Sequence, residues 1–252
     1  MRRLIEGSEI IETYKKDRVQ DAYSLRCLPQ VHGASRDALS YVETVLNIEI
    51  NSVTDNPIIF HEDGEAISGG NFHGQPIAMA MDFFGIAVAE IADISERRVA
   101  RLVDHKLSDL PPFLVAESGV NSGFMIPQYT AAAIVSENKV LAHPSCVDSI
   151  PTSAGQEDHV SMGGYSSRKA LTILNNTKRV ISIEMLNAAQ GIDFRAPLKP
   201  GRGTSAAYKA FRREVPFYAK DQYMQPLMLK SLELVTDGTI IDAVEKEIGE
   251  LK

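Results

Sequence analysis

The sequence predicts a mainly α-helical fold, a bundle of long helices with one small β-hairpin. Three long stretches show helical spacing of apolar residues, near 76–105, 127–141 and 166–190. A short segment between residues 57 and 68 has the pattern of a hairpin instead. The long helices are apolar around much of their circumference, so we expect them to be buried against other subunits. We expect residues 1–252 to form a single helical domain.

The first part of the chain alternates short elements with loops. For residues 1–19 we expect a polar segment that leads into the fold, or a frayed polar helix. After Gly33 we expect a helix that is capped by Ser35 and ends before Asn51, because its apolar residues share one face: Ala38, Leu39, Val42, Val45 and Leu46. The hairpin follows, with strands near 57–60 and 65–68 and Gly64 in the turn, where a positive φ is needed.

The three long helices make up most of the remaining chain. Pro76 suits the first turn of a helix that continues to about His105, and at roughly 1.5 Å per residue this helix would be on the order of 45 Å long. Loops are expected around 111–123 and 145–163. Past the third long helix we expect three shorter amphipathic helices, near 204–214, 220–234 and 238–251.

Composition narrows the class of protein. Hydrophobic residues make up 44% and charged residues 23%, which excludes a disordered tail and a membrane protein. The net charge is -7 and Lys and Arg are scattered, so nucleic acid is not an expected partner. The longest apolar segment, near 85–88, is interrupted by Glu90 and Asp93, so no membrane span is expected.

Cysteine usage indicates the compartment. Cys27 and Cys146 are the two cysteines, and they lack the spacing of metal ligands. The first nine residues carry positive charge with no apolar stretch behind it, unlike a secretory signal. We therefore expect a reduced, cytoplasmic protein.

One run of polar and ionisable residues, 20–33, is the first candidate site. Gln20, Tyr23 and Arg26 recur every third position and would form a staggered row if the segment is helical as far as Pro29. A guanidinium can bind a carboxylate through two parallel hydrogen bonds, and a phenol can transfer a proton. A solvated helix face explains the same spacing.

Two further loops carry candidate residues. Phe72 follows two glycines, so it could lie close to a ligand, although packing is the commoner role for such a residue. The run 156–159 places two acids beside a histidine, which suits acid–base chemistry, a metal or a helix N-terminal charge cluster. No second ligand stands at a suitable spacing from His73, so this histidine is interpreted as structural.

Several long motifs resemble the histidine ammonia-lyases, within the wider family of aromatic amino-acid ammonia-lyases and aminomutases. The similarity covers essentially the whole chain and rests on the run 20–33 and on five further segments: 51–57, 68–76, 118–128, 136–139 and 152–163. The tripeptide Ala-Ser-Gly, which cyclises in that family into the electrophilic methylidene-imidazolone group, does not occur. The chain thus resembles the C-terminal half of such an enzyme, without the N-terminal half.

The resemblance implies a fold, a site and partners. The fold would be the ammonia-lyase and fumarase-like helical core, assembled from several subunits. Arg26 would hold the substrate carboxylate, Gln20 and Tyr23 would line the electrophile, Phe72 would pack on it, and Glu157 would face the substrate side chain, with Tyr23 and Glu157 as catalytic residues. The methylidene-imidazolone would come from a partner chain that supplies the N-terminal half, and no metal is required.

The implied reaction removes ammonia from L-histidine to give trans-urocanate, a step of histidine degradation. A carboxylate at Glu157 suits an imidazole, whereas relatives acting on phenylalanine or tyrosine carry an amide there. Two alternatives stay open: a portion of a tyrosine or phenylalanine ammonia-lyase or aminomutase, and a non-catalytic assembly subunit of the same fold. Gly155 departs from the Asn of many relatives. We expect the isolated chain to be inactive under each alternative.

Overall fold

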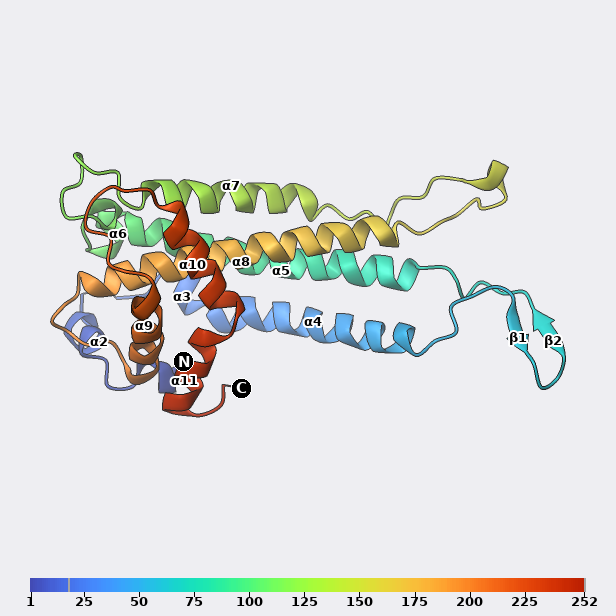
Figure 1. Ribbon diagram of the computed structural model, residues 1–252, viewed down its shortest axis with the longest axis horizontal. Coiled ribbons are helices and arrows are strands. Elements are labelled where there is room, and N and C mark those ends of the chain that lie inside the picture. The colour runs from blue at the N-terminus through green and yellow to red at the C-terminus, as the bar shows by residue number, and fades with distance from the viewer. Residues whose placement is uncertain (18, 252) are drawn as a thin grey trace. The chain divides into compact units, whose positions relative to one another are not determined.

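The computed structural model describes residues 1–17 and 19–251, and helices dominate it (Figure 1). Two compact units can be distinguished: the first is Met1–Leu28, Ala92–Val135 and Asn176–Lys252, and the second is Pro29–Ile91 and Ser136–Asn175. Three long helices contribute residues to both units: α5 (Gln75–Val103), α7 (Met125–Leu141) and α8 (Gly163–Asp193). The prediction of a mainly α fold with long helices and one small hairpin is confirmed.

The first unit contains most of the short helices. They are α1 (Arg2–Ile5), α2 (Glu9–Tyr14), α3 (Tyr23–Arg26), α6 (His105–Ser108), the 3₁₀ turn Pro112–Leu114, α9 (Arg202–Glu214), α10 (Gln225–Thr236) and α11 (Thr239–Ile248). Gln190 of α8 is fully buried and donates hydrogen bonds to the carbonyls of Leu114 and Tyr218, at 3.1 and 2.8 Å. Since buried carbonyls need partners, this amide ties the C-terminal segment to the loop before α7.

The second unit contains α4 (Leu28–Ile50), which runs antiparallel to the first part of α5 (Figure 1). Ser35 on α4 donates a hydrogen bond of 3.1 Å to the Ala87 carbonyl, and the rings of Tyr41 and Phe83 meet edge to face at 5.8 Å. A Cβ on Gly85 would lie 3.1 Å from the Ile173 side chain, so the small residue lets α5 and α8 approach closely.

The hairpin consists of β1 (Ile58–Phe60) and β2 (Glu65–Ile67), paired antiparallel with Ile58 opposite Ile67. Gly64 in the turn has φ of 68°, as the sequence predicts.

Some predicted helix ends are wrong. The helix assigned to Ser35 begins at Leu28 instead, and Ser35 lies buried inside it. Pro29 does not end a helix; it occupies the first turn of α4, where a missing N–H costs nothing. The second of the three predicted shorter helices is also shifted, because α10 begins at Gln225, with Pro226 in its first turn, and not near 220. None of the helices in the described part of the chain is both long and apolar enough to cross a membrane.

A buried ion pair joins three parts of the second unit. Asp82 of α5 and Lys169 of α8 are 5% and 7% exposed, and their charged atoms are 2.9 Å apart. The Asp82 carboxylate also accepts hydrogen bonds of 2.7 Å from the backbone amides of Ser145 and Cys146, while Lys169 donates to the His143 carbonyl. Burial raises the pKa of Asp82, but the hydrogen bonds from Lys169, Cys146 and Ser145 outweigh it and hold the pKa below its usual value.

We expect Asp82→Asn to lower the free energy of unfolding by about 3–5 kcal/mol, because it leaves the Lys169 charge buried without its partner. Since the folded-state pKa of Asp82 is depressed, its contribution is complete above the unfolded value of about 3.9 and is lost as the pH falls through the lower folded value. Urea unfolding at neutral and acidic pH measures both effects. Asp63→Asn, in the exposed hairpin turn, is the control; an equal effect of both variants would contradict the role of the pair.

Candidate functional site

The segment before α4 brings three candidate residues of the first unit together. The Arg26 guanidinium lies 4.6 Å from the centroid of the Tyr23 ring and donates a hydrogen bond of 2.5 Å to the Gln20 side-chain carbonyl. Tyr23 is 71% exposed, and Gln20 and Arg26 are exposed as well. The arrangement therefore offers an amide, a phenol and a guanidinium on one surface, as the sequence predicts.

The predicted reason for this cluster is wrong. Tyr23–Arg26 forms a separate single-turn helix that ends before α4 begins at Leu28, so Gln20 lies outside α3 and no staggered helical row runs from Gln20 to Pro29. The three side chains meet because Arg26 is long enough to reach back to Gln20 while its guanidinium lies over the Tyr23 ring. A stacked, hydrogen-bonded guanidinium has a defined plane, which suits the binding of a carboxylate.

The loops that carry Phe72 and Glu157 meet in the second unit. His73, which follows Phe72, and His159, two residues after Glu157, stack with ring centroids 5.4 Å apart, and His159 Nδ1 lies 3.3 Å from His73 Nε2. A Cβ on Gly74 would lie only 2.9 Å from Ser161 Oγ, so the glycine permits this approach. Phe72 is 57% exposed, so its ring does not belong to the core of this unit.

Glu157 projects from a tight turn. Its backbone forms a bridge with Thr152, and the Thr152 hydroxyl donates a hydrogen bond to its carboxylate. Between them Ser153, Ala154 and Gly155 all have positive φ, at 49°, 59° and 89°. Such a conformation is costly for Ser and Ala and marks a backbone held by its surroundings. The run 156–159 lies before α8, which begins at Gly163, so the charge cluster is not in the first turn of that helix.

The five candidate residues thus form two groups, one in each unit. Gln20, Tyr23 and Arg26 belong to the first unit, and Phe72 and Glu157 to the second. Sequence reasoning did not foresee the pairing of His73 with His159, which are 86 residues apart, or the Thr152 contact. The indication that the sequence offered for both contacts was that these residues lie inside the motifs 68–76 and 152–163.

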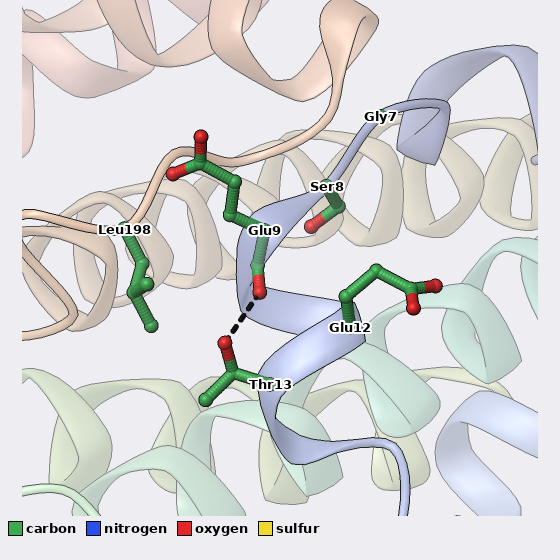
Figure 2. A pocket seen from close by; sticks show the side chains of 6 residues that line it. All are labelled: Gly7, Ser8, Glu9, Glu12, Thr13 and Leu198. Carbon is green, nitrogen blue, oxygen red and sulfur yellow. Dashed lines mark hydrogen bonds between the residues drawn. The ribbon is translucent and has the colours of Figure 1, made fainter.

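No candidate residue lies in the hollow shown in Figure 2. This hollow, of about 430 Å³, is lined by Gly7, Ser8, Glu9, Glu12, Thr13 and Leu198, and Thr13 donates a hydrogen bond of 2.8 Å to the Glu9 carbonyl within α2. In the described part of the chain, no group of three or more His, Cys, Asp and Glu is arranged to hold a metal ion.

Comparisons with known proteins place these residues in a family. The sequence model of the family described as aromatic amino acid lyase matches residues 1–213. The chain is 55% identical over 253 residues to the histidine ammonia-lyase of Natranaerobius thermophilus, covering 100% of this chain and 50% of that protein.

Two solved structures show the same fold. The histidine ammonia-lyase from Trypanosoma cruzi matches with a TM-score of 0.88 and 47% identity, over 92% of this chain and 46% of that one. The tyrosine aminomutase from Streptomyces globisporus matches with a TM-score of 0.89 and 36% identity, over 99% and 51%. The chain spans about half the length of the curated relatives it matches.

We expect Gly74→Ala to loosen the contact between the loops that carry Phe72 and Glu157, because the added Cβ would press on Ser161 Oγ. Faster hydrogen–deuterium exchange in peptides covering 70–74 and 156–162 would report the loosening, and Ser161→Ala in the same chain should reverse it. Gly70→Ala, where a Cβ meets nothing within 4 Å, is the matched control. Equal exchange in both single variants would show that the close approach does not hold the loops.

Proposed function

The chain belongs to the aromatic amino acid lyase family, and from this membership we propose that it is the C-terminal portion of a histidine ammonia-lyase. In the proposed reaction the Cα–N and Cβ–H bonds of L-histidine break, a Cα–Cβ double bond forms, and ammonia and trans-urocanate leave. The observation that favours histidine over other aromatic amino acids is the carboxylate of Glu157, anchored on its turn by Thr152.

Arg26 is proposed to bind the substrate carboxylate. Its guanidinium is already oriented by Gln20 and by the Tyr23 ring, so less freedom is lost when the substrate binds. Tyr23 presents an exposed phenol beside it, able to donate a hydrogen bond or to carry a proton. Gln20 fixes the other side of the guanidinium and offers its amide N–H groups to the same surface.

Glu157 is proposed to bind the substrate imidazole. An ionised carboxylate accepts the imidazole N–H and favours the cationic form of the ring. Phe72 is proposed to pack on the substrate and on the electrophile, since its ring is exposed on a loop that directly contacts the loop of Glu157 through His73 and His159. The aromatic ring of Phe72 suits packing on the face of an imidazole, and the carboxylate of Glu157, on the adjoining loop, suits the N–H at its edge.

The electrophile is proposed to be methylidene-imidazolone carried by a partner chain, because this chain has no Ala-Ser-Gly. The exposed amide and phenol of Gln20 and Tyr23 fit a group that bears a carbonyl oxygen, since both can donate a hydrogen bond to it. When bound, this group supplies the electrophile that makes the amino group of the substrate a better leaving group.

A partner with the N-terminal half, and association into an oligomer, are part of the proposal. Large apolar side chains are exposed along α4, α5 and α7, including Ile48, Ile50, Met79, Phe83, Ile126 and Val140, with exposed fractions from 42% to 77%. Apolar surface on this scale is typical of faces that other chains cover.

The proposal predicts that the chain copurifies with, or gains activity on addition of, a polypeptide that carries the N-terminal half. Native and denaturing mass spectrometry of the complex should show a second chain whose Ala-Ser-Gly has lost two water molecules. The same fraction should form urocanate from L-histidine, and the isolated chain should not. A complex that turns over L-tyrosine or L-phenylalanine instead would identify a different lyase or aminomutase, and an inert complex would indicate an assembly subunit.

In the reconstituted enzyme we expect Arg26→Leu to weaken the binding of L-histidine by about 2–5 kcal/mol, since truncating one partner of a buried charge pair costs about that much. This corresponds to a rise in KM of roughly 30-fold or more. Arg168→Leu is the matched control, because Arg168 is also exposed and lies over a tyrosine ring, that of Tyr165, on another helix. An unchanged KM in Arg26→Leu would remove Arg26 from the site.

We expect Glu157→Gln to lower kcat/KM for L-histidine by about 10- to 100-fold, which corresponds to the loss of one hydrogen bond to a charged group. The effect on L-phenylalanine should be smaller or opposite in direction, because its ring offers no N–H to a carboxylate. Steady-state rates with both substrates give the ratio. If the ratio of the two kcat/KM values does not change, Glu157 does not set the substrate preference.

A further inference from the structure

Helix α3 has too little structure of its own to hold Tyr23 and Arg26 in place. It contains four residues, has no side-chain cap at its N-terminus, and contains no buried residue. A helix this short is not stable by itself, because one turn gains few hydrogen bonds for the backbone freedom that it loses. The position of Tyr23 and Arg26 therefore depends on contacts from other elements.

Arg98 of α5 makes such a contact, within the first unit. Its Nη1 donates a hydrogen bond of 3.3 Å to the carbonyl of Ser24, the residue that follows Tyr23 in α3. The Arg98 side chain is 16% exposed, so this contact lies largely out of solvent. The bond reaches from one helix to another across 74 positions of the sequence.

The Arg98 guanidinium is itself fixed by Glu184 of α8. Its Nε and Nη2 both donate to the Glu184 carboxylate, the second over 2.7 Å, so that the pair is bidentate. The fully buried Ser95 donates a further hydrogen bond of 2.6 Å to Glu184 Oε2. Two parallel bonds fix the plane of a guanidinium, and the remaining nitrogen, Nη1, is then directed at Ser24.

We propose that Arg98, oriented by Glu184 and Ser95, is a positioning residue that holds α3 and thereby places Tyr23 and Arg26 for the substrate. The proposal rests on the proposed function for its catalytic consequence, but the hold on α3 is a property of this chain alone. Arg98 acts through the Ser24 carbonyl and not by contact with the substrate.

The variant Arg98→Lys tests whether Arg98 positions α3 or only contributes to the stability of the whole chain. A lysine can keep the ion pair with Glu184, but a single ammonium cannot reproduce two parallel bonds to the carboxylate and a third bond in the same plane. The neighbouring Arg97→Lys is the matched control, because Arg97 is 61% exposed and pairs with Glu96 rather than with α3. Glu184→Gln is a second variant, which keeps the shape of the side chain and weakens the hold on Arg98.

Cys27 reports on α3 without any need for activity. It directly follows the helix, its thiol is free and partly buried, and Cys146, in the other unit, provides an internal reference. We expect alkylation by iodoacetamide, followed by peptide mass spectrometry, to be about tenfold faster at Cys27 in Arg98→Lys than in the unmodified chain. This is the change expected for the loss of one hydrogen bond to a charged donor. The rate at Cys146 should be unchanged. Glu184→Gln should also make alkylation at Cys27 faster than in the unmodified chain.

In the reconstituted enzyme Arg98→Lys should raise KM for L-histidine about tenfold, with a smaller change in kcat, whereas Arg97→Lys should change neither. An unchanged rate at Cys27 would overturn the proposal, and so would equal acceleration at both cysteines, which is the signature of general destabilisation. If the unmodified complex forms no urocanate, the proposed function fails, while the cysteine measurement still decides whether Arg98 holds α3.

Discussion

A buried carboxylate determines how the second unit is built. Asp82 has almost no contact with solvent, so its charge has to be balanced by Lys169 and by the amides of Ser145 and Cys146. These partners come from α8 and from the loop after α7, so one side chain of α5 fixes both. That loop continues to Glu157 and returns at Gly163, where α8 begins. The loop that carries Glu157 is therefore held at its start, at Ser145 and Cys146, by a charge that lies well away from Glu157 in the sequence.

The helices were largely predictable because their signals are local. Apolar periodicity places α5, α7 and α8 within a few residues of their observed ends, and Gly64 marks the hairpin turn. Ser35 shows where this reasoning fails. A serine two positions after a glycine has the local pattern of a helix cap, but its hydroxyl instead donates a hydrogen bond to the Ala87 carbonyl of another helix. The same local rules give Pro29 two opposite roles, as a stop signal or as a first-turn residue, and only packing decides between them.

The candidate site was predictable by motif and not by geometry. Spacing suggested a helical row of Gln20, Tyr23 and Arg26, whereas the observed cluster depends on the reach of one long side chain outside a single turn. Contacts between distant segments carry no local signal at all. The stacking of His73 on His159 and the bond from Arg98 to Ser24 each join residues more than 70 positions apart. A single sequence can identify such residues as candidates, but it does not show which of them contact one another.

The exposure of the candidate residues has a consequence for electrostatics. Tyr23 and Phe72 are both more than half exposed, and Gln20, Arg26 and Glu157 are exposed too. In bulk water two unit charges 4 Å apart attract by only about 1 kcal/mol, and the attraction is several times larger where the effective dielectric constant is low. The described residues of this chain therefore supply the charges of the proposed binding site but not the low dielectric that would make those charges effective. The surface that displaces water from Arg26 and Glu157 has to come from outside them, and it determines the strength of each interaction as much as the residues do.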